Sequence, residues 1–435
     1  MRYITATALL AVSLASNAAP FLSREQQLGE RLFSDKNLSL NKNQACASCH
    51  GLSPAHAGTA QSKWVPGFVD PDNVRTGSAV SDGSVAGLSG SLNAPSAGYA
   101  AYSPEFHWDD AEALYIGGQF WNGRASNLAE QAKMPFLNPV EMAMPNELAV
   151  VNRLKQDGTY RRLFWQLYGI DLNEISAANK PLAEQVFQAA AKAIAAYEQS
   201  PVFNKFNSKF DYVLAGKTSF TPLEAKGFEL FNREDKGNCA ACHVSDATVA
   251  EDGGIEPPLF TDFSYDNIGL PRNVNIPGDP EPNLGLGGRA DLTTGAADEL
   301  GKHKVMSLRN IAITPPYGHN GSMATLEQIV HFYNTRDTLG SVDDVNHPGF
   351  GKTGWPEPEI GENLNRDELG NLGLSSEEET AIVAFMKTLT DDYPKWGHDR
   401  RVPPWSPAPF AQTVKPHHAR GFSQTRLNRI LRKHR

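Results

Sequence analysis

The chain repeats one pattern, first as Cys46-Ala47-Ser48-Cys49-His50 and again as Cys239-Ala240-Ala241-Cys242-His243, and the two copies contain all four of its cysteines. In Cys-x-x-Cys-His, two thiols one helical turn apart can bond to both vinyl groups of one porphyrin, while the next histidine binds the iron. A Cys-x-x-Cys pair alone would also suit a redox dithiol or half of a zinc site. Because a histidine follows both pairs and no cysteine is left over, the pattern predicts two covalently attached c-type haems.

A similar helix is predicted ahead of each copy, over residues 23–33 and 221–231. Each segment begins with a hydroxyl residue and has Gln or Glu three residues later, the spacing of a capping box. Both contain a glycine, Gly29 or Gly227, that permits close approach of another helix or of the haem edge. The repeated order of helix and haem motif indicates duplication of a cytochrome-c-like unit.

Each unit is expected to close with an amphipathic helix, over residues 181–199 in the first and 375–389 in the second. Long stretches rich in Gly, Ser, Pro and Asn, over 51–104 and 245–301, are typical of loops, which here can pack on haem. We therefore predict a mainly α fold made of two cytochrome-c-like haem domains related by internal duplication, with long loops and little strand.

The first 18 residues have the features of a secretory signal peptide: a basic Arg2, an apolar stretch over 4–15, and small residues at the cleavage positions. The stretch is too short to span a membrane, and a buried first helix is the alternative. Export agrees with the cysteines, because c-type haem is attached outside the cytoplasm. In a bacterium the protein would be periplasmic, with no membrane span and no nucleic-acid partner expected.

We expect an N-terminal haem domain over 19–205, a C-terminal haem domain over 206–394 and a basic tail over 395–435. The tail has ten Lys or Arg residues against Asp399 alone, although the whole chain carries a net charge of -9. Leu427, Ile430 and Leu431 can form an apolar stripe on a short helix that docks on an acidic surface. A solvated extension is the alternative.

Three further segments resemble the bacterial dihaem cytochrome c peroxidase and MauG family. They read Gln-Phe-Trp-Asn-Gly-Arg-Ala at 119–125, Met-Pro-Phe-Leu-Asn-Pro-Val-Glu-Met at 134–142 and Ser-Leu-Arg-Asn-Ile-Ala-Ile-Thr-Pro-Pro-Tyr-Gly-His-Asn-Gly at 307–321. The resemblance covers nearly all of the mature chain up to about Leu389. It implies an oxidoreductase that uses H2O2 and whose first haem is peroxidatic, while the second transfers electrons.

The resemblance also implies roles around the first haem. Glu141 matches the carboxylate that takes a proton from iron-bound peroxide and returns it to the leaving oxygen. Its apolar neighbours would raise its pKa towards a useful value. Gln131 matches a polar residue of the same pocket, and Trp121 matches the residue between the two haems, where an indole can relay electrons. Arg124 is a plausible partner of a haem propionate.

Family members hold a calcium ion between their domains, and the matching residues are Asn93, by its side chain, and Thr314 and Pro316, by their carbonyls. These are hard oxygen donors of the kind that Ca²⁺ prefers. Three oxygens do not complete the coordination shell, so water molecules would supply the rest.

The sixth ligand of the second haem separates the branches of the family. Simple peroxidases have Met at the position that matches Tyr333, whereas Tyr is typical of the MauG-like branch, including the MbnH-type enzymes. A phenolate stabilises higher oxidation states of iron than a thioether does. His331, Met306 and Met323 are the alternative ligands.

Peroxidases that need reductive activation carry a displaceable His before the position of Asn93, and residues 81–92 contain none. We therefore expect an open first haem, with His56 and His107 as the alternative distal ligands. The insertion over 99–116 and the tail lie outside the shared pattern, where they can shape partner recognition.

The preferred function is a periplasmic MauG-like oxidase that forms a high-valent dihaem state with H2O2 and oxidises a partner protein. The first alternative is a cytochrome c peroxidase that reduces H2O2 to water with electrons from a small cytochrome c or a cupredoxin. The second is a non-enzymatic electron-transfer cytochrome. Glu141 beside an open haem argues against a protein that only transfers electrons, because such a protein protects its iron with two axial ligands.

Overall fold

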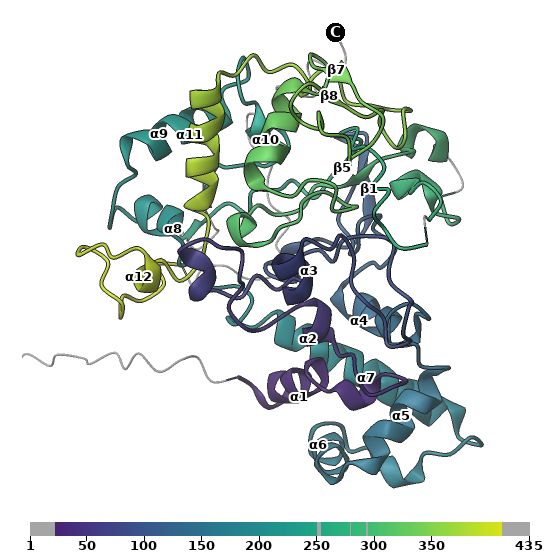
Figure 1. Cartoon of the computed structure of the whole chain (residues 1–435). Coiled ribbons are helices and arrows are strands. Elements are labelled where there is room, and N and C mark those ends of the chain that lie inside the picture. The colour runs from purple at the N-terminus through teal and green to yellow at the C-terminus, as the bar shows by residue number, and fades with distance from the viewer. Residues whose placement is uncertain (1–21, 250–253, 279, 293–294, 411–435) are drawn as a thin grey trace, which may run out of the picture.

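The computed structural model describes residues 22–249, 254–278, 280–292 and 295–410. The predicted signal peptide over 1–18 and the apolar stripe of Leu427, Ile430 and Leu431 lie outside the described residues. Two groups of helices, one from each half of the chain, are connected by long loops (Figure 1).

The helices account for most of the regular structure. Those of the first half are α1 (Arg24–Phe33), α2 (Cys46–Cys49), α3 (Pro71–Thr76), α4 (Leu128–Leu137), α5 (Glu147–Gln156), α6 (Gly158–Tyr168) and α7 (Lys180–Glu198). Those of the second half are α8 (Lys209–Leu214), α9 (Pro222–Asn232), α10 (Leu326–Thr335), α11 (Ser376–Lys387) and α12 (Tyr393–Trp396).

Strands are short and occur in pairs. Three pairs are antiparallel: β1 (His107–Asp109) with β2 (Leu114–Ile116), β3 (Thr248–Val249) with β4 (Ile255–Glu256), and β5 (Tyr265–Asp266) with β6 (His303–Lys304). The fourth pair, β7 (Gly340–Ser341) with β8 (Gly354–Trp355), is parallel. The prediction of a mainly α fold with little strand is therefore confirmed.

Capping boxes begin the helices that precede the haem motifs, as predicted. Ser23 caps α1 with Gln26, and Thr221 caps α9 with Glu224. Each capping box satisfies two backbone N–H groups that a helix start would otherwise leave without partners.

In each half, the helix before the haem motif crosses the closing helix at a glycine. A Cβ atom on Gly29 of α1 would overlap the carbonyl oxygen of Ala193 on α7, and one on Gly227 of α9 would overlap that of Ala381 on α11. Figure 1 shows α9 and α11 side by side. Of the two approaches considered for these glycines, close contact with another helix is the one observed.

Two large hydrophobic clusters form the cores of the halves. One draws its buried residues from Leu28 to Phe203, and the other from Phe210 to Leu389. We therefore propose a domain boundary near residue 205, as the sequence pattern suggested. A smaller cluster that includes Tyr99 and Phe206 lies where the halves meet.

A buried ion pair of the C-terminal half lies beside this small cluster, and the Tyr99 ring of the N-terminal half packs on it. Arg309 donates two hydrogen bonds of 3.0 Å to Asp211, and both side chains are 0% exposed. The guanidinium lies 4.5 Å from the centre of the Phe206 ring, and the Tyr99 hydroxyl donates to Asp391 over 2.9 Å. Removing one member would leave a buried charge without its partner, which costs about 3–5 kcal/mol.

The glycine crossing gives a test of the fold. We expect Gly29→Ala to lower the free energy of unfolding by about 1–3 kcal/mol, because the added methyl group pushes α1 away from α7. The helix propensity of alanine would by itself act in the opposite direction by about 1 kcal/mol. Chemical unfolding followed by circular dichroism measures the change.

The control is Gly361→Ala, because a Cβ at Gly361 meets nothing within 4 Å. We expect it to change stability by less than about 0.5 kcal/mol. If Gly29→Ala unfolds at the same denaturant concentration as the control, the crossing does not require glycine.

Candidate functional site

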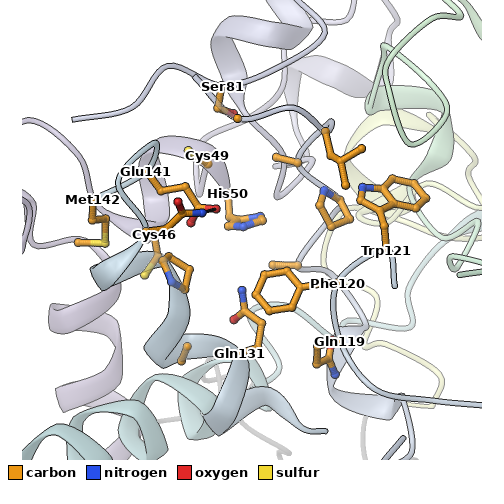
Figure 2. A pocket seen from close by; sticks show the side chains of 18 of the residues that line it. Cys46, Cys49, His50, Ser81, Gln119, Phe120, Trp121, Gln131, Glu141 and Met142 are labelled. Carbon is orange, nitrogen blue, oxygen red and sulfur yellow. Dashed lines mark hydrogen bonds between the residues drawn. The ribbon is translucent and has the colours of Figure 1, made fainter. Parts of the chain in front are cut away.

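The first haem motif borders a cavity of about 440 Å³. Figure 2 shows Glu141, Gln131 and Trp121 around the same space as His50. The predicted residues that line it are Cys46, Cys49, His50, Asn93, Trp121, Arg124, Gln131 and Glu141. Segments that are almost a hundred residues apart in the sequence are thus brought to one cavity.

A backbone carbonyl orients the histidine of each motif. His50 Nδ1 lies 3.2 Å from the Phe68 carbonyl oxygen, and His243 Nδ1 lies 2.9 Å from that of Phe260. A carbonyl oxygen only accepts, so Nδ1 carries the proton and Nε2 is available to a metal. Burial lowers the pKa of both imidazoles, which favours the neutral form that binds iron.

Glu141 lies in the tight turn that follows α4. Its backbone N–H donates to the carbonyl of Asn138 over 3.0 Å, and the Asn138 side-chain amide donates to Glu141 Oε1 over 2.7 Å. Burial raises the pKa of the carboxyl group, while this hydrogen bond and the charge of Arg124 oppose the rise. The site therefore holds a largely buried carboxyl group with a raised pKa beside a cavity, where it can accept and release a proton.

Arg124 and Gln131 lie at the same cavity. The exposed Arg124 guanidinium packs 3.5 Å from the centre of the Phe120 ring, and Gln131 is on α4. Arg124 can therefore reach an anionic group at the mouth of the cavity, whereas Gln131 offers an amide inside it.

Trp121 lines both cavities. Its Nε1 donates to the Asn93 carbonyl over 2.8 Å, and its own carbonyl accepts from the Lys304 N–H over 2.8 Å. Its ring meets those of His303 and His319 edge to face, at centroid distances of 6.5 and 6.4 Å. These contacts fix the indole in the wall between the two sites.

The second motif borders a smaller cavity of about 200 Å³, lined by Cys239, Cys242, His243 and Tyr333 among others. Tyr333 reaches it from α10. The larger first cavity leaves more room for a small substrate, while the second suits a metal held by two side chains.

Two of the three alternative ligands of the second site lie outside its cavity. His331 Nδ1 is 2.9 Å from a carboxylate oxygen of Glu379, and its side chain does not line the cavity. Met323 is fully buried in the hydrophobic core. Met306 lines the cavity, as Tyr333 does, and so stays the alternative ligand.

Neither alternative ligand of the first site reaches it. His56 and His107 are exposed, and His107 Nδ1 is 2.8 Å from the Glu105 carbonyl oxygen. Within the part of the chain that the structure describes, His50 is the only histidine that lines this cavity.

The predicted calcium residues come from two adjacent segments. Asn93 is buried and donates Nδ2 to the Ala79 carbonyl over 2.9 Å, which leaves its Oδ1 as an acceptor. Its backbone N–H donates to the carbonyl of His319, three residues after Pro316. The hard oxygen donors of Asn93, Thr314 and Pro316 fit Ca²⁺.

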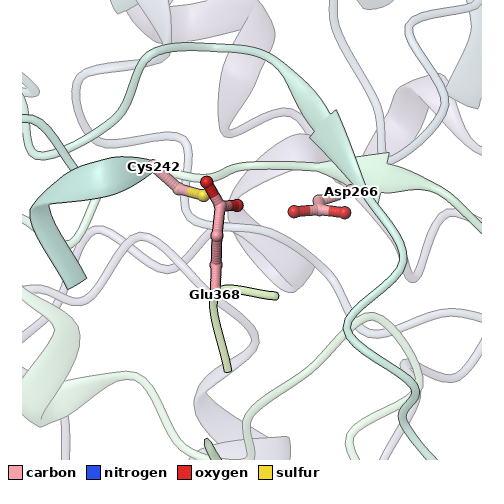
Figure 3. Close-up of side chains that lie close together, drawn as sticks. All are labelled: Cys242, Asp266 and Glu368. Carbon is pink, nitrogen blue, oxygen red and sulfur yellow. The ribbon is translucent and has the colours of Figure 1, made fainter. Parts of the chain in front are cut away.

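Figure 3 shows Cys242, Asp266 and Glu368 close together, with potential ligand atoms within 4.8 Å of one another. The Asn365 amide donates to both carboxylates, over 2.6 and 2.8 Å. Because the Cys242 thiol belongs to a haem motif, we assign this group to the edge of the second haem cavity and not to a separate metal ion.

Sequence reasoning missed several polar residues of the two cavities. Glu198, at the end of α7, is 5% exposed and lines the first cavity, and burial raises its pKa to about 8. Its position four residues after Ile194, on the apolar face of α7, was the available signal. His303 stacks on His319 at 3.6 Å in the second cavity, and no sequence pattern predicted this pair.

Comparison with known proteins is consistent with this arrangement. The sequence profile of the family described as di-haem cytochrome c peroxidase matches residues 23–219. The methylamine utilization protein MauG of Paracoccus denitrificans is 40% identical over 387 residues, which cover 88% of this chain and 92% of that protein. The chain belongs to the dihaem cytochrome c peroxidase and MauG family. It is thus a haem-containing oxidoreductase that uses H2O2.

Two further relatives are similar over most of their length. Cytochrome c551 peroxidase of Nitrosomonas europaea is 31% identical over 378 residues, covering 85% of this chain and 80% of that protein. The crystal structure of the dihaem peroxidase BthA from Burkholderia thailandensis has a TM-score of 0.68 and 28% identity, covering 88% of each chain. The relatives therefore include both a MauG protein and peroxidases.

Among the described residues, no helix combines the length and the apolar character needed to cross a membrane.

The hydrogen bond from Asn138 predicts a shift in the titration of Glu141. Asn138→Leu removes a donor that stabilises the carboxylate, so the pKa of Glu141 should rise further. The acidic limb of the rate of reaction with H2O2 should then move to higher pH. Stopped-flow measurement of the haem absorbance across a pH series detects this shift.

Asn146→Leu is the matched control, because Asn146 is exposed and caps α5. It should leave the acidic limb in place. Equal pH profiles for Asn138→Leu and the wild type would show that this amide does not control the carboxyl group.

Proposed function

We propose that the protein is a MauG-like oxidase, which uses H2O2 to withdraw electrons from a side chain of a partner protein. The observation that carries this proposal is Tyr333, which reaches the second cavity at the position where simple peroxidases of the family have Met. A phenolate donates negative charge to iron and so favours its higher oxidation states.

The residues of both cavities fit covalently attached haem. Each has two cysteines that form no disulfide and an imidazole whose Nδ1 is bound to a carbonyl, so that Nε2 is left for the iron. His50 would bind the first iron, and His243 with Tyr333 the second. When bound, the haems would supply the redox chemistry: peroxide is reduced at the first, and oxidising equivalents are shared with the second.

Glu141 would act as the acid-base group. It takes a proton from one oxygen of H2O2 and returns it to the other, so that water leaves and hydroxide does not. The raised pKa of Glu141 suits this exchange, because a strongly acidic carboxyl group would hold the proton too weakly. Gln131 would orient the peroxide by hydrogen bonding, and Arg124 would bind a haem propionate.

Trp121 would connect the two sites. Its indole lies in the wall shared by both cavities, where an aromatic ring shortens the distance that an electron must cross. Asn93, Thr314 and Pro316 would hold a calcium ion next to it. Because Trp121 Nε1 donates to the Asn93 carbonyl, the ion would also stiffen the position of the indole.

We further propose that the protein is exported to the periplasm by its N-terminal signal peptide and meets its partner there. A basic tail over 395–435 suits contact with an acidic surface. The competing function is a cytochrome c peroxidase, which takes electrons from a small cytochrome c or a cupredoxin. The chain is similar both to a MauG protein and to a cytochrome c551 peroxidase, which supports keeping this alternative function.

Replacing the acid-base group tests the first site. Glu141→Gln keeps the size of the side chain but cannot exchange the proton, so the rate of reaction with H2O2 should fall by about 10²- to 10⁴-fold. The matched control is Glu130→Gln on α4, whose side chain does not line the cavity. An unchanged rate in Glu141→Gln, with haem content equal to the control, would remove Glu141 from the mechanism.

Replacing Tyr333 separates the two functions. In a MauG-like oxidase, peroxide should produce a long-lived near-infrared band from charge shared between the haems, and Tyr333→Phe should abolish it. His331→Asn is the control on the same helix, because His331 is bound to Glu379 outside the cavity. Rapid turnover with reduced cytochrome c that Tyr333→Phe does not change would instead support the simple peroxidase.

A further inference from the structure

We propose that Trp108, on the hairpin of β1 and β2, is the surface site at which electrons from the partner protein enter. The proposal rests on the proposed function and adds the place of contact. The hairpin belongs to the insertion over 99–116 that lies outside the shared peroxidase pattern.

Trp108 is 44% exposed on β1. It is followed by Asp109 and Asp110, and Asp109 closes the hairpin turn by accepting from the N–H groups of Ala111 and Glu112. The exposed indole is therefore held on a short, fixed hairpin beside two carboxylates. This chemistry suits a protein partner with a basic patch, which would be attracted to the acidic groups.

A continuous series of aromatic rings leads inward from Trp108. The ring of Trp108 meets that of Tyr115 edge to face at a centroid distance of 4.9 Å, and Tyr115 stacks on Phe106 at 5.1 Å. Phe106 then meets Tyr265 at 6.0 Å. At these distances each ring contacts the next. Trp165, which is 61% exposed, makes no such ring contact within the described part of the chain.

The inner end of the series reaches the wall between the two cavities. Phe106 and Tyr265 meet at Gly123, two residues after Trp121, where a Cβ atom would overlap the Phe106 ring and the Tyr265 hydroxyl. Tyr265 pairs with Lys304, whose N–H donates to the Trp121 carbonyl, and the next residue, Asp266, lines the second cavity. The rings thus connect the surface with the loop that carries the proposed relay.

Arg289 fastens the hairpin to that loop. Its guanidinium lies 4.0 Å from the centre of the Phe106 ring and donates to the Gly123 carbonyl over 2.9 Å. A salt bridge of 2.6 Å to Asp291 orients the same side chain. A cation over a ring is attractive, so this contact keeps the series of rings assembled before any partner arrives.

The electron balance is consistent with a surface site that passes one electron at a time. Reduction of one H2O2 to two molecules of water consumes two electrons and two protons. The partner's side chain loses the two electrons one at a time and releases the protons. Trp108 gives one electron inward and is restored by the partner. Tryptophan can do this without losing a proton, whereas the Tyr265 hydroxyl donates to the Gly117 carbonyl, which cannot take one.

Chemical trapping provides a test that does not need the partner. Haem-loaded protein receives excess H2O2 without a donor, and peptide mass spectrometry locates the oxidised residues. A trapped tryptophan reacts with water, loses two electrons and two protons and gains one oxygen atom, while one H2O2 becomes two molecules of water. We expect the oxygen on Trp108 or its neighbour Tyr115 at tenfold or more the level on Trp165.

Two variants complete the experiment. Trp108→Phe should lower the rate at which peroxide oxidises a reduced basic cytochrome c by tenfold or more, whereas Trp165→Phe should not change it. Equal oxidation of Trp108 and Trp165 would contradict the proposal that electrons enter at Trp108, and so would an unchanged rate in Trp108→Phe. Neither result would contradict the roles proposed for Glu141 and Tyr333. If the wild-type haem does not react with peroxide, both the proposed function and electron entry at Trp108 are contradicted.

Discussion

The arrangement depends on a steric constraint: in each half, the helix before the haem motif and the closing helix must touch through their backbones. Gly29 and Gly227 leave no room for a side chain at the crossing points. Each haem motif follows within about twenty residues of its glycine, so the crossing sets where the chain turns towards the cavity. The backbone carbonyls of Phe68 and Phe260 then turn the two histidines inwards.

The same arrangement of paired helices accompanies two chemically different cavities. In the first, a carboxyl group with a raised pKa faces the larger space. In the second, a tyrosine occupies the corresponding smaller space. The two halves therefore share the haem motif and differ in the side chains that line the cavity beside it. Trp121, which belongs to the wall of both, gives the two sites a shared contact.

Periodicity and capping patterns in the sequence predicted the helices of both halves well. The closing helix of the first half was predicted over 181–199, and α7 spans Lys180–Glu198. The other closing helix was predicted over 375–389, and α11 spans Ser376–Lys387 with Ser375 in a capping box at its start. Hydrophobic periodicity and capping depend on residues within a few positions of one another, so a single sequence contains them.

The walls of the cavities were harder to predict from local patterns. His303 of the two-residue strand β6 stacks on His319, which lies in a loop. Arg289 binds a turn more than 160 residues earlier in the chain. Such contacts depend on how long, aperiodic segments fold over each other. Family resemblance supplied Glu141, Trp121 and Tyr333, whereas the hairpin of Trp108 appeared in the sequence only as an insertion.

The buried contacts of Tyr99 affect how the two halves can move. Its ring lies 5.0 Å from the Arg309 guanidinium, which is paired with Asp211 in the C-terminal half, and its hydroxyl donates to Asp391. Separating the halves would break these contacts and expose a buried ion pair to water. We therefore expect the halves to behave as one rigid body, with the separation of the two iron sites fixed at assembly. Electrons would then pass between them by tunnelling over a constant distance, without waiting for a domain motion.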